Sequence, residues 1–326
     1  MIIVRAPFRV SLCGGGSDLP SFYEKYGGCV ISTTIKKYIY LCMQPSFKED
    51  DIVLKYSKTE IVHIADEIEH KIFKQVLKDM NISGVEIASM ADIPAGTGLG
   101  SSSSFTVALL KLLYAYKGIS VSDYKVAKNA CEVEIDKLLK PIGKQDQFAA
   151  SFGGLKFYEF CRDGFVKVEP IVLSKENYRK LEDSLMMFYT GDVRDANTIL
   201  KEQSDNIISK SKVVEGTKQL VELTKQLKKE FENNNIEALG DILHKSWIIK
   251  KQLANGISNP RIDEYYNKAI KAGAKGGKLL GAGGGGFLLF YVSDNQNKEN
   301  VRRALFDLKE TKLEFDQSGC SIVFME

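Results

Sequence analysis

The chain has 326 residues, 44% of them hydrophobic, and its 45 Lys and Arg residues against 42 Asp and Glu leave a formal net charge of +3. This length suffices for two globular domains with their own cores. So balanced a charge is not typical of proteins that bind nucleic acid or membranes, and no apolar run is long enough for a transmembrane helix. The first residues predict a strand rather than a signal peptide, and the six cysteines form no C-x-x-C pair. We therefore expect a cytoplasmic protein with reduced thiols and no metal cluster.

The first half of the chain alternates strand and helix patterns. Period-two apolar residues and flanking turn residues predict strands at 1–13, 27–44, 51–57, 60–65, 84–90, 155–160 and 165–173. Apolar stripes at helical spacing predict helices at 66–80, 101–116 and 122–139, with a short helix or turn at 144–154.

The second half begins with charged helices and ends in strands. Helices are predicted at 196–255, 259–273 and 297–309, and strands at 277–282, 286–293, 312–317 and 321–325. The change of pattern near residues 180–195 predicts a boundary there, which divides the chain into domains 1–185 and 186–326. Both domains are expected to be α+β.

A stretch of small residues, PAGTGLGSSSSF at positions 94–105, stands directly before a predicted helix. Glycines at alternate positions let the backbone approach an anion closely, and the start of a helix offers unpaired N–H groups. Serine hydroxyls add donors or ligate a phosphate-bound Mg²⁺. A serine cap on the helix is the plainer alternative, but a cap needs one serine rather than four. We interpret the stretch as a phosphate-binding loop.

Two common nucleotide-binding signatures do not account for this loop. Ser101 stands where a Walker A loop needs lysine and where a dinucleotide fingerprint needs its last glycine. The spacing G-x-G-x-x-G does occur at Gly281, Gly283 and Gly286, but a strand follows it where a helix is required. The segment GAGGGG at 281–286 instead indicates backbone lying against a ligand or against the other domain.

Two charged residues stand out near the N-terminus. Arg9 lies in a strand that otherwise reads as buried, so its charge requires a partner. Asp18 follows the glycines that end this strand. It is either an Asx-turn residue or a carboxylate that binds a ligand, and the residues alone favour neither.

Glu134 falls on the apolar stripe of the predicted helix 122–139, whereas Glu132 lies on its polar side. A carboxylate on a buried face needs a cation. Beside a phosphate loop this cation is expected to be Mg²⁺, and pairing with a lysine is the alternative.

Three segments resemble, in order and spacing, the motifs of the GHMP kinase superfamily, which includes galactokinase, homoserine kinase and mevalonate kinase. They are APFRVSLCGGGSD at 6–18, PAGTGLGSSSS at 94–104 and KLLGAGGGGF at 278–287. Within the superfamily, the stretch 14–41 is most similar to the D-glycero-D-manno-heptose 7-phosphate kinases. Galactokinases have Glu-His where this chain has Gly15-Gly16, which argues against galactose as the substrate.

The resemblance implies a two-domain α+β fold, with an N-terminal domain like ribosomal protein S5 domain 2 and a ferredoxin-like C-terminal domain. It implies that Glu134 and Ser102 hold Mg²⁺, although Ser101 and Ser103 stand next to Ser102. It also implies that Asp146 takes or orients the proton of the acceptor hydroxyl. Arg9 is the superfamily-matched cation beside Asp146, and Lys144 is a local alternative. Taken alone, Asp146 would read as a helix cap or a solvated acid.

The resemblance further implies two sets of binding residues. Those for the nucleotide are Pro94, Gly96, Gly98, Leu99, Gly100, Ser101, Ser102, Ser103 and Ser104. Those for the acceptor are Asp18, Gly15, Gly16, Arg194, Gly283 and Gly284. The guanidinium of Arg194 suits a second phosphate, and a solvated arginine at a helix start is an equal alternative.

The expected activity is phosphorylation of the anomeric hydroxyl of D-glycero-D-manno-heptose 7-phosphate by ATP and Mg²⁺. The product would be the 1,7-bisphosphate, on the route to nucleotide-activated heptose. The alternatives are an anomeric kinase of another sugar such as fucose, and a non-catalytic relative that senses a sugar. Retention of Asp146 and Glu134 argues against the sensor. The expected partners are a sugar phosphate and ATP, not nucleic acid or membrane, and the sequence leaves a homodimer open.

Overall fold

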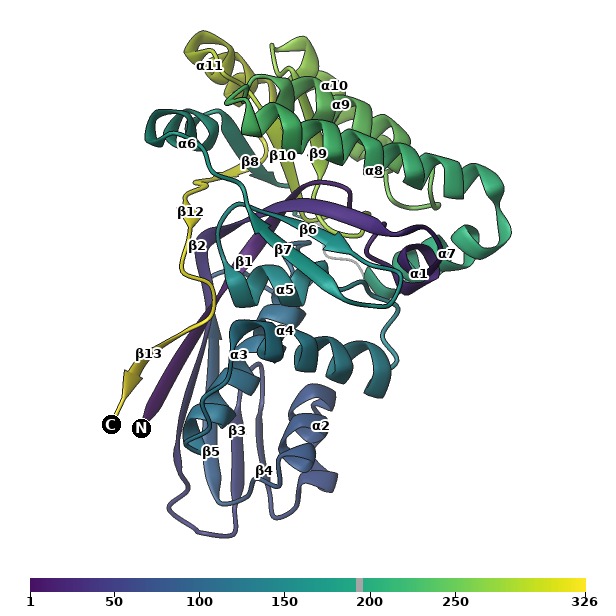
Figure 1. Cartoon of the computed structure of the whole chain (residues 1–326). Coiled ribbons are helices and arrows are strands. Elements are labelled where there is room, and N and C mark those ends of the chain that lie inside the picture. The colour runs from purple at the N-terminus through teal and green to yellow at the C-terminus, as the bar shows by residue number, and fades with distance from the viewer. Residues whose placement is uncertain (192–195) are drawn as a thin grey trace.

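A computed structural model describes residues 1–191 and 196–326. Their strands form two sheets, and helices cover both (Figure 1). The helices of the first half are α1 (Pro20–Tyr26), α2 (Lys71–Asp79), α3 (Ser101–Tyr116), α4 (Asp123–Cys131), α5 (Gln145–Phe152) and α6 (Lys175–Asp183). Those of the second half are α7 (Ala196–Ser209), α8 (Ser211–Glu232), α9 (Ala238–Lys250), α10 (Pro260–Lys271) and α11 (Asn295–Ala304).

The larger sheet has nine strands, with the order β13-β1-β2-β5-β3-β4 along its main path. β6 and β12 also pair with β2, and β7 pairs with β6. The strands are β1 (Ile2–Cys13), β2 (Gly28–Pro45), β3 (Ile52–Lys55), β4 (Thr59–Val62), β5 (Val85–Ala91), β6 (Lys156–Phe160), β7 (Val166–Pro170), β12 (Phe315–Asp316) and β13 (Ser321–Met325).

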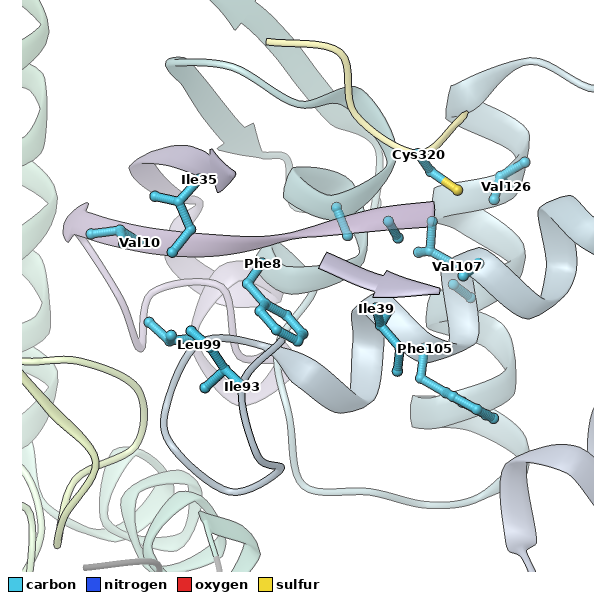
Figure 2. Packing of buried hydrophobic residues seen from close by; sticks show 14 of the residues in the cluster. Phe8, Val10, Ile35, Ile39, Ile93, Leu99, Phe105, Val107, Val126 and Cys320 are labelled. Atoms are coloured by element: carbon cyan, nitrogen blue, oxygen red, sulfur yellow. The ribbon is translucent and has the colours of Figure 1, made fainter. Parts of the chain in front are cut away.

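α3 covers one face of this sheet and forms its core with β1 and β2. Phe8 and Val10 of β1 and Ile35 of β2 are fully buried. They lie in one cluster with Phe105 and Val107 of α3 (Figure 2). This packing fixes the N-terminus of α3 beside the end of β1, which positions the site described below.

The smaller sheet has four antiparallel strands in the order β11-β8-β10-β9. They are β8 (Leu185–Tyr189), β9 (Gly276–Leu279), β10 (Phe287–Tyr291) and β11 (Lys309–Thr311). Helices follow β8 and β10 along the chain, which gives the β-α-β-β-α-β succession of a ferredoxin-like fold. This confirms the expected α+β architecture of the second half.

The two halves share a core. α8 and α9 contact β1 of the larger sheet, and α9 also packs on β9 and β10 of the smaller one. Leu227, Phe231 and Leu243 of these helices belong to the same hydrophobic cluster as Phe8. A continuous hydrophobic core therefore joins the two halves.

The end of the chain returns to the larger sheet, although the sequence analysis assigned it to the second domain. Ile2 of β1 pairs with Met325 of β13, and Ile35 of β2 pairs with Phe315 of β12. The two termini consequently lie side by side (Figure 1). Strand pairing joins residues far apart in sequence, and a local apolar pattern does not name the partner strand.

Two predicted helices differ in detail from the observed ones. In place of the single helix predicted at 122–139, α4 ends at Cys131 and a π-helical turn, Glu132–Lys137, follows it directly. The long helical region 196–255 comprises α7, α8 and α9. All six cysteines are free thiols. Within residues 1–191 and 196–326, no helix is long and apolar enough to cross a membrane.

Candidate active site

A cleft lies where the end of β1, the starts of α3 and α5, and segments of the second half meet. We call it the cleft throughout. Its lining includes Arg9, Ser11, Gly15, Gly16, Asp18, Gly96, Gly98, Gly100, Ser101, Ser102, Ser103, Lys140, Gly143, Gln145, Asp146, Asn197, Gln203, Lys250, Gly281 and Gly283. Most of the residues expected for the nucleotide and the acceptor are therefore brought together.

The N-terminus of α3 opens into this cleft without a side-chain cap. The cap residue is Gly100, in the left-handed conformation with φ 76°, and no side chain accepts a hydrogen bond from the first turn. Thus none of the serines acts as the cap that the plainer alternative required. The first N–H groups of a helix and its dipole favour an anion at such an end.

Three of the residues assigned to the nucleotide lie away from the cleft lining. Ser104 is buried and its hydroxyl donates to the carbonyl of Pro7 at 2.9 Å. Leu99 is buried in the core near Phe8 (Figure 2). Pro94 is not among the lining residues either. The loop turns sharply, so only part of the motif faces the cleft.

The glycine segment 281–286 packs against the loop that precedes α3. A Cβ on Gly281 would lie 2.4 Å from the Cα of Gly98, and one on Gly286 would lie 2.3 Å from the carbonyl oxygen of Thr97. The close approach therefore involves the other half of the chain, one of the two possibilities left open. Gly283 lines the cleft, whereas the Gly284 amide donates to the carbonyl of Ile257 at 3.1 Å and does not line it.

Arg9 and Asp146 form a two-pronged ion pair in the cleft. Arg9 Nε donates to Asp146 Oδ1 and Nη2 donates to Oδ2, both at 2.8 Å. The third nitrogen, Nη1, donates to the carbonyl of Gly98 at 2.6 Å. Asp146 lies in the first turn of α5 without capping it. The guanidinium therefore fixes the carboxylate against the loop that precedes α3, as charge-assisted bidentate pairs do.

Burial raises the pKa of Asp146 above its ordinary value, the ion pair with Arg9 opposes this, and the nearby Asp18 adds to it. Lys144, the local alternative to Arg9, contacts different groups. Its Nζ donates to the carbonyl of Gly164 at 2.8 Å and lies over the ring of Tyr23. The charge of Arg9 is thus the one that Asp146 meets directly.

Glu134 is completely buried beside the start of α3, as its place on the apolar stripe predicted. Its Oε1 accepts from Ser102 Oγ and from Lys140 Nζ, each at 2.8 Å, and its Oε2 accepts from Gln147 Nε2 at 2.8 Å. Lys140 Nζ also lies 2.8 Å from Ser102 Oγ. The ammonium of Lys140 therefore contacts both oxygens expected to hold Mg²⁺, and these oxygens also contact each other.

These oxygens fit a hard cation, because a hydroxyl and a carboxylate already share one positive charge there. Mg²⁺ usually takes one or two protein oxygens together with substrate phosphates. In the described part of the chain no group of three or more His, Cys, Asp or Glu side chains could hold a metal ion. A cation at Ser102 and Glu134 would thus depend on further ligands from a bound phosphate.

The π-helical turn Glu132–Lys137 directs Glu134 toward Ser102. Such turns often occur at functional sites because they reorient one side chain within a helix. Leu139, just after the turn, is exposed and has φ 52°, a backbone conformation that is uncommon for a residue with a branched side chain. This uncommon conformation precedes Lys140 and turns the chain back toward the cleft.

Asp18 is buried, and its carboxylate is held by several donors. Oδ1 accepts from the Gly16 amide at 2.9 Å and from Gln145 Nε2 at 3.1 Å. An Asx-turn would need the N–H two residues on, which Pro20 lacks. A Cβ on Gly143 would lie 2.0 Å from Asp18 Oδ2, so only glycine leaves room for the carboxylate. The acid thus lines the cleft, and its hydrogen bond from the Gly16 amide also ties it to the turn that precedes it.

Three buried polar atoms beside Asp18 have no hydrogen-bond partner among the described residues. They are Ser11 Oγ, Gln145 Oε1 and Gln203 Nε2, and all three residues line the cleft. A Cβ on Gly16 would lie 2.3 Å from Gln203 Nε2, so Gly16 admits this amide from α7. Buried polar groups without partners suit a ligand rich in hydroxyls. Arg194 lies outside the described residues.

The sequence analysis missed Gln203 and Lys250, which reach the cleft from α7 and α9. Gln203 is 1% exposed and Lys250 8% exposed, although both belong to charged helices. Lys250 follows Leu243 and Trp247 by seven and three residues, on the buried face of α9. The reasoning that identified Glu134, a polar residue on an apolar stripe, would have identified Lys250 as well.

Two stretches of the chain match known protein families, one in each half. Residues 68–154 match the family described as GHMP kinases N terminal domain, and residues 227–309 match GHMP kinases C terminal. The chain is 30% identical over 317 residues to the D-glycero-alpha-D-manno-heptose 7-phosphate kinase of Campylobacter jejuni, covering 93% of each. It is 27% identical over 343 residues to the bifunctional fucokinase/GDP-fucose pyrophosphorylase of Arabidopsis thaliana, covering 96% of this chain and 31% of that one.

Solved structures show the same fold. The crystal structure of a D-glycero-D-manno-heptose 1-phosphate kinase from Bacteroides thetaiotaomicron aligns with a TM-score of 0.81 at 25% identity, over all of both chains. Lactococcus lactis galactokinase complexed with galactose aligns with a TM-score of 0.78 at 18% identity, over 98% of this chain and 94% of that one. The two family matches and the relative that is 30% identical over 93% of the chain show that the chain belongs to the GHMP kinases, a family of ATP-dependent phosphotransferases.

Proposed function

We propose that the protein transfers the γ-phosphoryl group of ATP to the anomeric hydroxyl of D-glycero-D-manno-heptose 7-phosphate, giving the 1,7-bisphosphate. The observation that carries the proposal is the Arg9–Asp146 ion pair, in which a buried guanidinium joins a partly buried carboxylate to the loop before the uncapped start of α3. A phosphate-binding helix end and a candidate proton acceptor thereby share one cleft with Asp18.

The chemistry follows from these positions. The triphosphate would lie on the free N–H groups at the start of α3, which suit an anion. The acceptor oxygen attacks the γ-phosphorus, the bond to the β–γ bridging oxygen breaks, and ADP leaves with the electron pair. The hydroxyl proton passes to a carboxylate oxygen of Asp146, which Arg9 keeps oriented.

Ser102 and Glu134 would hold Mg²⁺, and the ammonium of Lys140 would move away from both oxygens. When bound, this ion supplies neutralisation of the charge on the β- and γ-phosphate oxygens. Gln147 would keep Glu134 oriented through its hydrogen bond to Oε2.

The acceptor would lie beside Asp18, where Ser11 Oγ, Gln145 Oε1 and Gln203 Nε2 could form hydrogen bonds with its hydroxyl groups. The name of the Campylobacter relative supports a heptose 7-phosphate. Arg194 is proposed for the phosphate of this acceptor because a guanidinium binds phosphate oxygens in pairs. Fucose is the second candidate, since two relatives similar over 96% and 92% of this chain are named as fucokinases with a second, nucleotide-transferring activity.

A substrate panel tests the proposal. Heptose 7-phosphate, fucose and galactose are each incubated with ATP, Mg²⁺ and the enzyme, and new anomeric phosphates are detected by ³¹P NMR. We expect the heptose phosphate to react with the highest kcat/KM. A faster reaction with fucose would replace the proposed acceptor, and ADP formation that persists unchanged in an Asp146→Asn variant would reject the catalytic assignment.

A further inference from the structure

Lys250 places an amine in the cleft from the second half of the chain. It is the last residue of α9, its side chain is more than nine-tenths buried, and it lines the cleft. Its Nζ donates to the carbonyl of Gly281 at 2.6 Å. Among the described residues it forms no ion pair with a carboxylate.

A buried ammonium without a counter-anion is costly. Burial lowers the pKa of Lys250 well below its ordinary value, the charges of Lys278 and Arg9 lower it further, and the carboxylates of Asp18 and Asp146 oppose this. These two acids do not offset the three basic side chains, so a bound anion would favour the protonated amine.

Short contacts place Lys250 near the loop before α3. Gly281, which accepts its hydrogen bond, packs on Gly98 so closely that a Cβ would lie 2.4 Å from the Gly98 Cα. The carbonyl of Gly98 accepts from Arg9 Nη1 at 2.6 Å. Arg9 and Lys250 therefore approach the same turn from the two halves of the chain, and Arg9 also holds Asp146.

We propose that Lys250 is a catalytic residue that donates a hydrogen bond to the oxygens of the phosphoryl group during its transfer. This inference rests on the proposed kinase function and assigns a protein cation to the transferred group, while Arg9 holds Asp146. The phosphorus forms its bond to the acceptor oxygen and loses its bond to the β–γ bridging oxygen, while Lys250 keeps its proton throughout. Its role is to balance the charge on the non-bridging oxygens, where preorganised donors contribute most.

Lys278 provides a matched control. It is also buried, at 3% exposed, and burial lowers its pKa to about 8. Its Nζ donates to the carbonyl oxygens of Ser11 at 2.9 Å and Leu12 at 3.4 Å, and it does not line the cleft. Replacing a lysine that is buried for structural reasons should thus change the affinities for ADP and for the nonhydrolysable ATP analogue AMPPNP by the same factor.

The test compares Lys250→Met, Lys250→Arg and Lys278→Met with the unaltered enzyme. Calorimetry measures the affinity for ADP and for the nonhydrolysable analogue AMPPNP, each with Mg²⁺. For Lys250→Met we expect AMPPNP to bind about tenfold to a hundredfold more weakly and ADP to change less than about twofold, because only AMPPNP carries the γ-phosphate. We expect kcat with heptose 7-phosphate to fall by at least the same factor, with partial recovery in Lys250→Arg.

Several results would overturn the inference. These are equal losses for ADP and AMPPNP, unchanged affinities with an unchanged kcat, or an effect confined to the KM of the phosphorylated acceptor. The last would assign Lys250 to the phosphate of the acceptor. If the unaltered enzyme bound neither nucleotide, the proposed function would itself fail. A selective loss in Lys278→Met would also contradict the assignment, because that lysine lies outside the cleft.

Discussion

Replacing Lys140 by methionine should strengthen the binding of Mg²⁺. Lys140 Nζ contacts both Glu134 Oε1 and Ser102 Oγ at 2.8 Å. On the proposed assignment, the metal has to displace this ammonium from the unaltered enzyme. In the variant the metal has no ammonium to displace. Glu134 is then buried without the positive charge of the lysine, and a bound metal would supply that charge.

The size of the effect follows from the contacts that remain. Breaking a fully buried ion pair costs about 3–5 kcal/mol. Here the Lys140 side chain is 21% exposed, and Glu134 keeps its hydrogen bonds from Ser102 and Gln147. We therefore expect the free energy of Mg²⁺ binding to become more favourable by about 2 kcal/mol, which is comparable to one hydrogen bond to a charged group. This corresponds to about 30-fold tighter Mg²⁺ binding.

The assay is titration of Mg²⁺ into the complex of each protein with AMPPNP, followed by calorimetry, with thermal unfolding measured in EDTA and in Mg²⁺. Lys140→Met should unfold earlier than the unaltered protein in EDTA, and the difference should shrink in Mg²⁺. Lys137→Met is the control, because Lys137 pairs with Asp79 and Glu132 at a more exposed position on the same turn. Weaker or unchanged Mg²⁺ binding in Lys140→Met would refute the reasoning, since the lysine would then assist the metal or lie outside its site.

Three further predictions concern the cleft. Asp146→Asn should lower kcat by about 10²–10⁴-fold. In the unaltered enzyme the raised pKa of Asp146 should place the acid limb of the pH–rate profile above the ordinary range of an aspartate, since the ionised form is the active one and is lost as the pH falls. A limb at or below pH 4 would contradict this. Gly143→Ala should displace the carboxylate of Asp18 and raise the KM of the acceptor while leaving the affinity for AMPPNP unchanged, and an unchanged KM would show that Asp18 does not bind the acceptor. Gly98→Ala should lower the free energy of unfolding by about 1–3 kcal/mol and weaken AMPPNP binding, because its φ of 85° and a carbonyl 2.4 Å from the new Cβ both oppose a side chain. Gly118→Ala, with φ 65° but open space around it, should cost less in chemical denaturation and leave nucleotide binding intact.

Short motifs and periodicity predicted those features that depend on neighbouring residues. Alternation over residues 1–13 predicted the first strand, and the small residues before Ser101 predicted the start of a helix. Helical spacing placed Glu134 on a buried face, and its side chain is completely buried. These predictions succeeded because backbone geometry sets which side chains share a face within one element.

The residues themselves did not predict contacts between distant segments. Arg9 needed a partner, and only the resemblance to the GHMP kinases suggested Asp146, 137 positions on; the tertiary structure showed that Asp146 supplies two oxygens. The tertiary structure alone showed the return of the C-terminal strands to β1 and β2, and the entry of Gln203 and Lys250 into the cleft. The sequence determined what each segment could form and which charges required compensation. The partners that provide this compensation were decided when the two halves packed together, because burial and strand pairing act between residues brought together only by the complete fold.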